Sequence, residues 1–210
     1  MKALDAIGKV NNLATSQRGM FTSAQARALG VDRTALARLA KRGQVERVLH
    51  GVYRSGGAPS LREEDVIAAW MSLEPKTPSY ERDKGPDGFI ASLNTAAWLH
   101  GLGELNPIPI VFSHPGRRQT RKERLSFIDR ELEVGDVTVV SGIPATTPSR
   151  TVLDLIDYGE DLSLVANALA DAVSRGMVDD EARFAAEVDA RAGRCGFGEG
   201  FPLYRYLRRG

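Results

Sequence analysis

Residues 20–54 read MFTSAQARALGVDRTALARLAKRGQVERVLHGVYR and contain two short helical patterns, a glycine turn between them and two β-like runs after them. Thr22 is a favoured N-cap residue for the first helix, which ends at Gly30. Asp32 then caps a second helix, and we expect Val31 to fill the gap between the two helices. Two short helices followed by a hairpin are typical of a winged helix-turn-helix.

The second helix has two faces of different chemistry. Leu36, Leu39 and Ala40 stand at i, i+3 and i+4, so they form one apolar stripe for packing. The opposite face carries small and cationic residues, which suits insertion into the major groove of DNA. We expect these residues to face the bases: Arg33, Thr34 and Arg38. We expect these residues of the helix end and the wing to serve mostly phosphates: Lys41, Arg42, Arg47 and His50.

The charge is distributed unevenly along the chain. Residues 1–57 contain ten Lys/Arg against three Asp/Glu, a balance of +7, whereas residues 58–210 contain 18 against 24, a balance of −6. The total of +1 therefore hides a dipolar protein. A basic N-terminal part favours a polyanion as its partner, while the acidic remainder would repel nucleic acid over much of its surface.

Composition excludes several classes of protein. The 210 residues are 42% apolar and 26% charged, as in a globular protein of one large or two small domains. No apolar run approaches 18 residues and no signal-peptide pattern is present, so we expect a cytoplasmic protein without a membrane partner. The lone Cys195 excludes an intramolecular disulfide framework and a cysteine-based zinc site.

The pattern along the chain predicts an α+β protein of two domains. Residues 1–57 form the winged helix-turn-helix, opened by a helix over 3–15, and residues 58–210 form a mixed α+β body with a small sheet and several helices. The glycines and proline of residues 55–60 predict a hinge, and residues 75–88 predict a loop or a mobile insert. In the body we expect helices over 61–73, 92–99, 149–157, 162–174 and 179–192, and strands over 108–113, 124–129 and 136–140. The tail 193–210 stays unassigned, and its segment 196–200, GFGEG, is interpreted as a flexible tail.

Two ordered blocks of residues carry a family resemblance. The first block is Gly19, Thr22, Gln25, Ala26, Gly30, Val31, Leu36, Leu39, Gly43, Val48, Gly51, Val52 and Tyr53. The second block is Ser92, Ala96, Ala97, Trp98, Leu99, His100, Gly101, Leu102, Gly142, Pro144, Thr146, Pro148, Arg150, Thr151, Leu153 and Asp154. Together they resemble the AbiEi family of antitoxins and transcriptional regulators, partners of nucleotidyltransferase-type toxins, over roughly residues 5–160.

The resemblance implies that the protein counteracts a cognate nucleotidyltransferase-like toxin and represses its own operon. Direct and indirect neutralisation both stay open. A ligand-responsive regulator without a toxin partner is the alternative, and an enzyme is a third class. Because one winged helix contacts only a short half-site, we expect a monomer that pairs on inverted repeats of the operator.

No catalytic constellation and no cofactor site is expected. The three histidines, His50, His100 and His114, are far apart in sequence, and none has metal-ligand spacing. His100, near a helix end, is interpreted as a capping or core histidine. Arg150 stands four residues before Asp154, a spacing that favours a local ion pair on a helix.

Two further charged segments could bind a partner. The loop 116–124 carries five Lys/Arg and one Glu between two expected strands. It offers a second phosphate contact or a docking surface for an acidic partner, besides being a plain solvated loop, through Arg117, Arg118, Arg121 and Lys122. The helices of residues 154–189 are acidic and would suit a basic toxin surface, because their acids exceed what compensation of the helix dipoles at their N-termini needs.

Overall fold

The computed structural model describes residues 3–209 and divides the chain into two compact units, Met1–Asp83 and Lys84–Gly210. Each unit combines helices with one small sheet, so the fold class is α+β, as the sequence predicts. No helix of the described residues is long and apolar enough to cross a bilayer.

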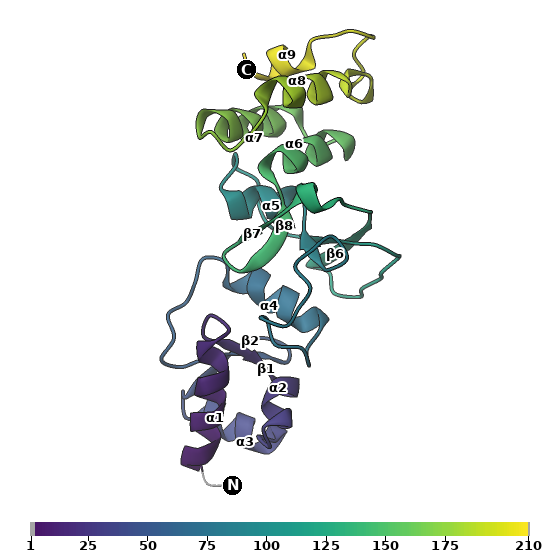
Figure 1. Cartoon of the computed structure of the whole chain (residues 1–210). Helices are drawn as coiled ribbons and strands as arrows, with labels where there is room; N and C mark the ends of the chain where they lie inside the picture. Colours follow the sequence, from purple (N-terminus) through teal and green to yellow (C-terminus); the bar gives the residue numbers. More distant parts are fainter. Residues whose placement is uncertain (1–2, 210) are drawn as a thin grey trace. The chain divides into compact units, whose positions relative to one another are not determined.

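The first unit is the winged helix-turn-helix with one further helix (Figure 1). Its elements are α1 (Ala3–Thr15), β1 (Met20–Thr22), α2 (Ser23–Ala28), α3 (Arg33–Lys41), β2 (Val45–Leu49), β3 (Val52–Ser55) and α4 (Glu64–Leu73). The three strands form an antiparallel sheet in the order β1-β3-β2. The hairpin β2–β3 is the expected wing, and β1 is a third strand that the sequence pattern did not indicate.

Helix α1 packs through residues four apart. Ala6, Val10 and Ala14 are buried with the core of α2 and α3, whereas Ile7 and Leu13 are only partly buried against it. The small alanines allow α1 to lie close to the other helices, and Val10 fills the centre of the contact. The buried face of α1 is therefore centred on Ala6, Val10 and Ala14, and Ile7 and Leu13 lie at its margin.

The segment after the wing belongs to the first unit. Helix α4 packs against β1, β2 and β3, and its residues 66–71 are all buried. The following loop is held by Arg82, which is 5% exposed and donates to the carbonyl oxygens of Trp70 (2.6 Å) and Met71 (2.8 Å) at the end of α4. Burial lowers the pKa of Arg82 to about 10, against the opposing effect of Glu74. The structural boundary thus follows residue 83 rather than the expected residue 57.

Residues 55–60 form a packed turn. The Gly56 N–H donates to the Gln44 carbonyl oxygen (2.9 Å), and Ala58 N–H donates to that of Ser55 (3.0 Å). A Cβ atom on Gly56 would lie 2.4 Å from the Gly43 carbonyl oxygen, a backbone atom that cannot rotate away. The chain at this glycine approaches its neighbour too closely for any side chain.

This contact predicts different effects for two adjacent glycines. Gly56→Ala should destabilise the protein by about 1–3 kcal/mol, because the backbone of the turn must shift. Gly57→Ala is the matched control, since a Cβ atom there would meet nothing within 4 Å. Urea denaturation of both variants checks this, and equal stability of the two would show that the turn yields freely.

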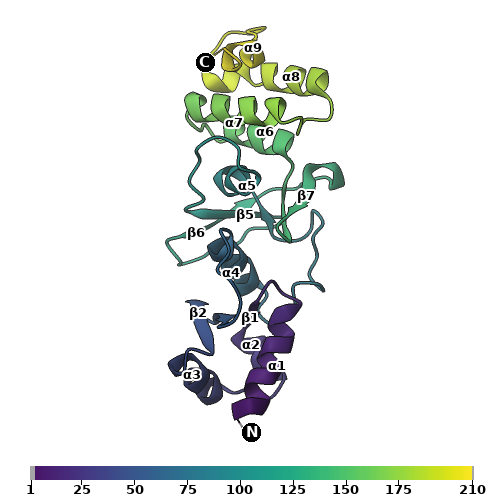
Figure 2. The ribbon, with the colours of Figure 1, turned by 90° about the vertical axis from the view of Figure 1, so that its left-hand side faces the viewer.

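The second unit contains a five-stranded mixed sheet in the order β6-β5-β4-β8-β7. Its strands are β4 (Ile90–Ala91), β5 (Ile110–His114), β6 (Leu125–Asp129), β7 (Val137–Val140) and β8 (Ile143–Thr146). Its helices are α5 (Leu93–His100), α6 (Pro148–Asp157), α7 (Leu162–Ser174), α8 (Glu181–Asp189) and α9 (Leu203–Leu207), with short 3-10 turns η1 (Val134–Asp136) and η2 (Ala192–Cys195). In Figure 2, α5 covers one face of the sheet, and α6 and α7 lie beyond it.

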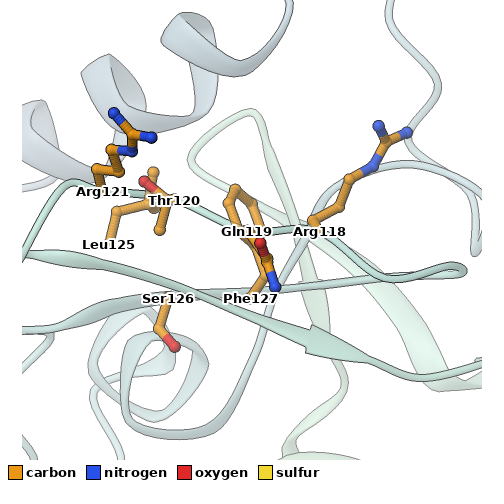
Figure 3. Close-up of a pocket in the computed structure, with 7 residues that line it drawn as sticks. All are labelled: Arg118, Gln119, Thr120, Arg121, Leu125, Ser126 and Phe127. Atoms are coloured by element: carbon orange, nitrogen blue, oxygen red, sulfur yellow. The ribbon is translucent and has the colours of Figure 1, made fainter.

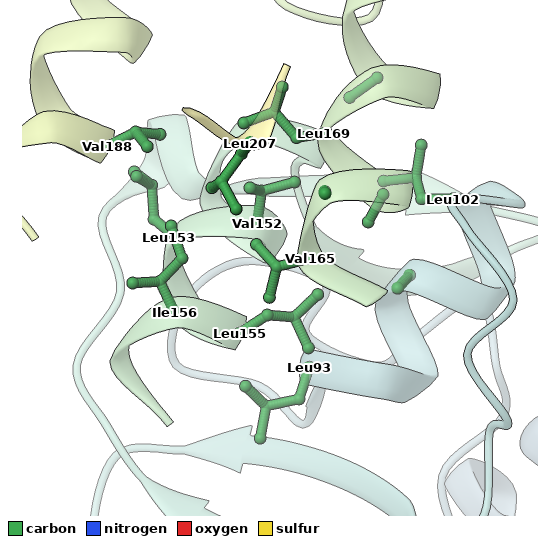
Figure 4. Packing of buried hydrophobic residues seen from close by; sticks show 14 of the residues in the cluster. Leu93, Leu102, Val152, Leu153, Leu155, Ile156, Val165, Leu169, Val188 and Leu207 are labelled. Atoms are coloured by element: carbon green, nitrogen blue, oxygen red, sulfur yellow. The ribbon is translucent and has the colours of Figure 1, made fainter. Parts of the chain in front are cut away.

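The core of the second unit lies among its helices (Figure 4). Val152 and Leu155 of α6 pack with Val165 and Leu169 of α7, and all four are at most 1% exposed. Burial of side chains of this size contributes about 1.5–3 kcal/mol each, before the entropy of ordering them is subtracted. Helix α5 joins this cluster through Leu93.

The C-terminal tail is part of this core. Leu203 (0% exposed) and Leu207 (3%) of α9 are buried against α7 and α8. The interpretation of residues 196–200 as a flexible tail is wrong, because Phe197 and Phe201 also pack on this cluster and stack on each other at 4.1 Å. The spacing of Leu203 and Leu207 at i and i+4 is the sequence signal for this helix.

His100 is a core histidine, as expected from the sequence. Its side chain is buried, and its Nε2 lies 2.8 Å from the Thr146 carbonyl oxygen, to which the neutral ring donates. Burial lowers the pKa of His100 below its ordinary value, and the nearby Arg175 adds to this effect. The imidazole therefore joins α5 to β8 as an uncharged donor.

Candidate nucleic-acid interface

The first helix of the helix-turn-helix begins with a reciprocal cap. The Gln25 N–H donates to the Thr22 hydroxyl (3.1 Å), and the Thr22 N–H donates to the Gln25 side-chain oxygen (2.9 Å). This capping box satisfies two backbone donors that a helix start leaves open. The predicted cap at Thr22 is confirmed.

The second helix, α3, is fixed by its cap and its apolar stripe. The Ala35 N–H donates to Asp32 Oδ1 at 2.7 Å. Leu36 and Leu39 are each 2% exposed, and Val31 in the turn is completely buried. Since one stripe of α3 is buried in the unit, the opposite stripe must face outward.

All seven predicted DNA-binding residues lie exposed in the first unit. Within residues 3–209, no ion pair to an acidic side chain is made by Arg33, Arg38, Lys41 or Arg42. Four cations close together without counter-charges form a surface of positive potential. A surface of this kind binds the negatively charged phosphate backbone of a nucleic acid.

The wing is tied to the helices by a backbone contact. The Ser23 N–H, at the start of α2, donates to the carbonyl oxygen of Gly51 at the wing tip (2.8 Å). At the same tip, Arg47 Nη2 lies 2.5 Å from His50 Nδ1, so the two predicted phosphate ligands lie side by side. The Ser23–Gly51 bond joins residues far apart in sequence, and no sequence signal indicates it.

Arg54, in contrast, is neutralised within the unit. It pairs with Glu46 (2.5 Å) across the hairpin and with Glu64 (2.6 Å) of α4. Counted over Met1–Asp83, the unit has thirteen Lys/Arg and nine Asp/Glu, a balance of +4 rather than the +7 of residues 1–57. Arg54 therefore adds little to the positive potential of the unit, unlike Arg33, Arg38, Lys41 and Arg42.

The predicted basic loop connects β5 and β6 in the second unit. Arg117, Arg118, Arg121 and Lys122 are all exposed. Because β5 and β6 are parallel, the loop has to run back along the sheet. It borders a pocket of about 460 Å³ that Gln119 of the loop and Phe127 of β6 both line (Figure 3).

Several aspartates of the acidic helices also bind the protein's own backbone. Of their aspartates, four accept a hydrogen bond from a backbone N–H, and these are Asp161, Asp171, Asp180 and Asp189. Asp161 and Asp180 are N-caps, while Asp171 and Asp189 bind the N–H groups of Gly103 and Tyr204. Asp161 and Asp180 thus meet the capping need of α7 and α8, while the use of this acidic surface by a partner stays a prediction.

Across the described residues 3–209, no group of three or more His, Cys, Asp or Glu side chains could hold a metal ion. The predicted ion pair of Arg150 and Asp154 is confirmed at 2.7 Å, and it lies inside the second unit.

Comparison with known proteins gives two family matches. Residues 9–56 match the model described as transcriptional regulator, AbiEi antitoxin, and residues 89–195 match the AbiEi antitoxin C-terminal domain. No curated protein matches the chain.

A solved structure supports the same fold. The RV2827C protein from Mycobacterium tuberculosis is similar over 97% of this chain and 80% of that chain, with a TM-score of 0.55 and 15% identity. At this identity the similarity concerns the fold alone. The two family matches together support an antitoxin and regulator role without indicating catalysis. The chain belongs to the AbiEi family of antitoxins and transcriptional regulators.

Proposed function

We propose that this protein binds operator DNA through its first unit and represses its own operon. Helix α3 enters the major groove, where Arg33, Thr34 and Arg38 contact base edges. The phosphates on either side are bound by Lys41, Arg42, Arg47 and His50.

The observation that carries this proposal is the exposed cationic face of α3. Its arginines and lysine have no acidic partners among residues 3–209, while Leu36 and Leu39 on the other face fix the helix in place. Guanidinium groups in such positions bind the O6 and N7 atoms of guanine with two hydrogen bonds. The wing, held to α2 by the Ser23–Gly51 bond, gives the phosphate contacts a fixed position relative to α3.

We further propose that the protein counteracts a nucleotidyltransferase-like toxin, as the family membership suggests. Asp161 and Asp180 cap α7 and α8 and stay exposed, so their carboxylates are also accessible to a basic partner surface. Neutralisation by direct contact and neutralisation through the toxin's substrate or product are both compatible with this surface.

Both parts of the proposal can be tested in one strain. The full chain is expressed with the neighbouring toxin gene and with a reporter under its own promoter. Arg33→Ala/Arg38→Ala should relieve repression at least tenfold and leave growth rescue unchanged, because these exposed residues belong to the DNA-binding unit. Arg205→Ala/Arg209→Ala, two exposed arginines of the second unit, is the charge-matched control. Unchanged repression by the Arg33→Ala/Arg38→Ala variant would contradict DNA binding through α3. Growth arrest by the toxin despite expression of the wild-type protein would contradict the antitoxin role.

A further inference from the structure

Strand β6 is the outer strand of the second unit's sheet, with β5 on one side only. The Ile110 N–H donates to the Arg124 carbonyl oxygen (2.8 Å), which fixes the direction of alternate residues along β6. Arg124, Ser126 and Ile128 direct their backbone groups to β5, so Phe127 and Asp129 direct theirs outward. An outward row of N–H and C=O groups is a template for another strand.

Pockets lie on both faces of the sheet at this edge. On one face, the pocket of Figure 3 is bordered by Arg118, Arg121 and Phe127. On the other, a pocket of about 590 Å³ is bordered by Leu105, Ile108, Tyr158 and Ser126. A strand added to β6 would place alternate side chains over these two pockets, as in recognition by strand addition.

The charges flanking β6 have opposite signs at its two ends. The loop 116–124 before it carries five cationic residues and one acid. After it, Asp129, Glu131 and Glu133 are exposed, while Arg130 points inward to its ion pair with the buried Asp154. Edge strands that are protected from pairing carry charges that repel a second strand. The segments flanking β6 instead carry opposite charges, basic before the strand and acidic after it, so they do not repel a second strand in every orientation.

We propose that two copies of this chain pair through β6 in antiparallel orientation. Antiparallel pairing brings the basic flank of each copy to the acidic flank of the other, whereas parallel pairing would bring like charges together. A two-fold axis at Phe127 places this residue opposite its counterpart, with Leu125 opposite Asp129 of the second copy. The two sheets then join into one.

The pairing is weak in free solution, and it does not require DNA. β6 has five residues, so only a few intermolecular hydrogen bonds form, each contributing about 0.5–1.5 kcal/mol. Two copies held on neighbouring half-sites of one operator have an effective concentration on the order of millimolar, which favours the pair. The surface deepens the proposed function by giving the means of pairing, yet protein alone suffices to test it.

Charge reversal tests the orientation. Arg117→Glu/Arg118→Glu/Arg121→Glu leaves two cations against four acids in the loop and so makes both flanks acidic, and Glu131→Arg/Glu133→Arg makes both basic, so each variant alone should pair at least tenfold more weakly than wild type. Mixing the two variants should restore pairing, because each flank again meets its opposite. Sedimentation equilibrium up to about 0.5 mM measures the weight-average mass. Arg205→Glu/Arg208→Glu/Arg209→Glu, away from β6 in sequence, is the control for net charge.

A cysteine at the proposed axis gives a second, independent measurement. In a Cys195→Ser background, Phe127→Cys should form an intermolecular disulfide at least tenfold faster than Val139→Cys on the opposite edge strand, β7. In the proposed pair, the two copies of residue 127 exchange backbone hydrogen bonds. Residues in such a hydrogen-bonded antiparallel pair have Cα atoms about 5.5 Å apart, which a disulfide can span. Equal oxidation rates at both positions, or mixed charge variants that pair no better than each alone, would overturn the proposal. A β6 edge that binds an acidic peptide from another protein but never a second copy would also overturn it.

Discussion

Replacing Asp154 with alanine should destabilise the protein by about 3–5 kcal/mol, one of the largest effects expected of a single substitution here. The Asp154 side chain is completely buried and receives Arg150 Nε at 2.7 Å together with the guanidinium group of Arg130. Burial raises the pKa of Asp154, and both guanidinium groups oppose this rise. Removing the carboxylate leaves two partly buried cations, 22% and 19% exposed, without their main partner.

The Arg183–Glu187 pair provides the matched control. It has the same i,i+4 spacing and a similar distance of 2.9 Å, but the Arg183 side chain is 78% exposed. Glu187→Ala should therefore cost less than about 1 kcal/mol. Urea denaturation of both variants tests the role of burial, and a loss for Asp154→Ala no larger than that for Glu187→Ala would contradict it.

Replacing both Arg33 and Arg38 with alanine should weaken operator binding by about 2–6 kcal/mol, or roughly 30-fold to 10⁴-fold if the two effects add. Each guanidinium that binds a guanine with two hydrogen bonds contributes discrimination against other bases. Stability should be nearly unchanged, because both side chains are exposed. Competition between operator and random duplex DNA measures the loss, which should fall mainly on the operator.

The control must separate base reading from loss of charge. Arg205→Ala/Arg209→Ala removes two positive charges from the second unit and should leave operator preference unchanged. An Arg33→Ala/Arg38→Ala variant that still prefers its operator as strongly as wild type does would assign base reading to other residues.

The helix-turn-helix could be predicted from the sequence because its signals are local. Thr22 and Asp32 are caps in the sequence and in the structure, and Leu36 and Leu39 are buried as their spacing indicates. Such features depend on contacts within one or two turns of helix. The exposed residues of α3 proposed for DNA, Arg33, Thr34, Arg38 and Lys41, follow from the same pattern, since a buried stripe defines the opposite face.

Strands β1, β4 and β8 could not be predicted because their signals are weak or misleading. β1 and β4 have three and two residues, too few for an alternating pattern. β8 lies inside the sheet and contains Pro144, which argues against a central strand because proline has no N–H. Strands β4 and β8 are paired at one position, Ala91 with Ala145. No backbone N–H of Pro144 is therefore needed for this pairing.

The unit boundary could not be predicted because it depends on long-range contacts. Glycines and a proline at residues 55–60 favour a hinge and a tight turn equally, and the close approach of Gly56 to Gly43 makes it a turn. The loop after α4 is held to the helix-turn-helix through Gln17, whose side-chain oxygen accepts from Ser79 N–H at 2.9 Å. These residues are 62 positions apart, beyond the range of any local pattern.

The most direct test of DNA binding through the first unit is an operator titration of the full chain at several salt concentrations. The logarithm of the association constant should fall linearly with the logarithm of salt, with a slope of about −0.9 for each phosphate neutralised. Lys41→Ala/Arg42→Ala/Arg47→Ala should flatten this slope by roughly two to three and weaken all sequences alike. Neutralising Arg117, Arg118, Arg121 and Lys122 on the β5–β6 loop should leave the slope of a single bound chain unchanged. If instead the loop variant flattened the slope and the α3 and wing variant kept it, the first unit would not be the DNA-binding surface.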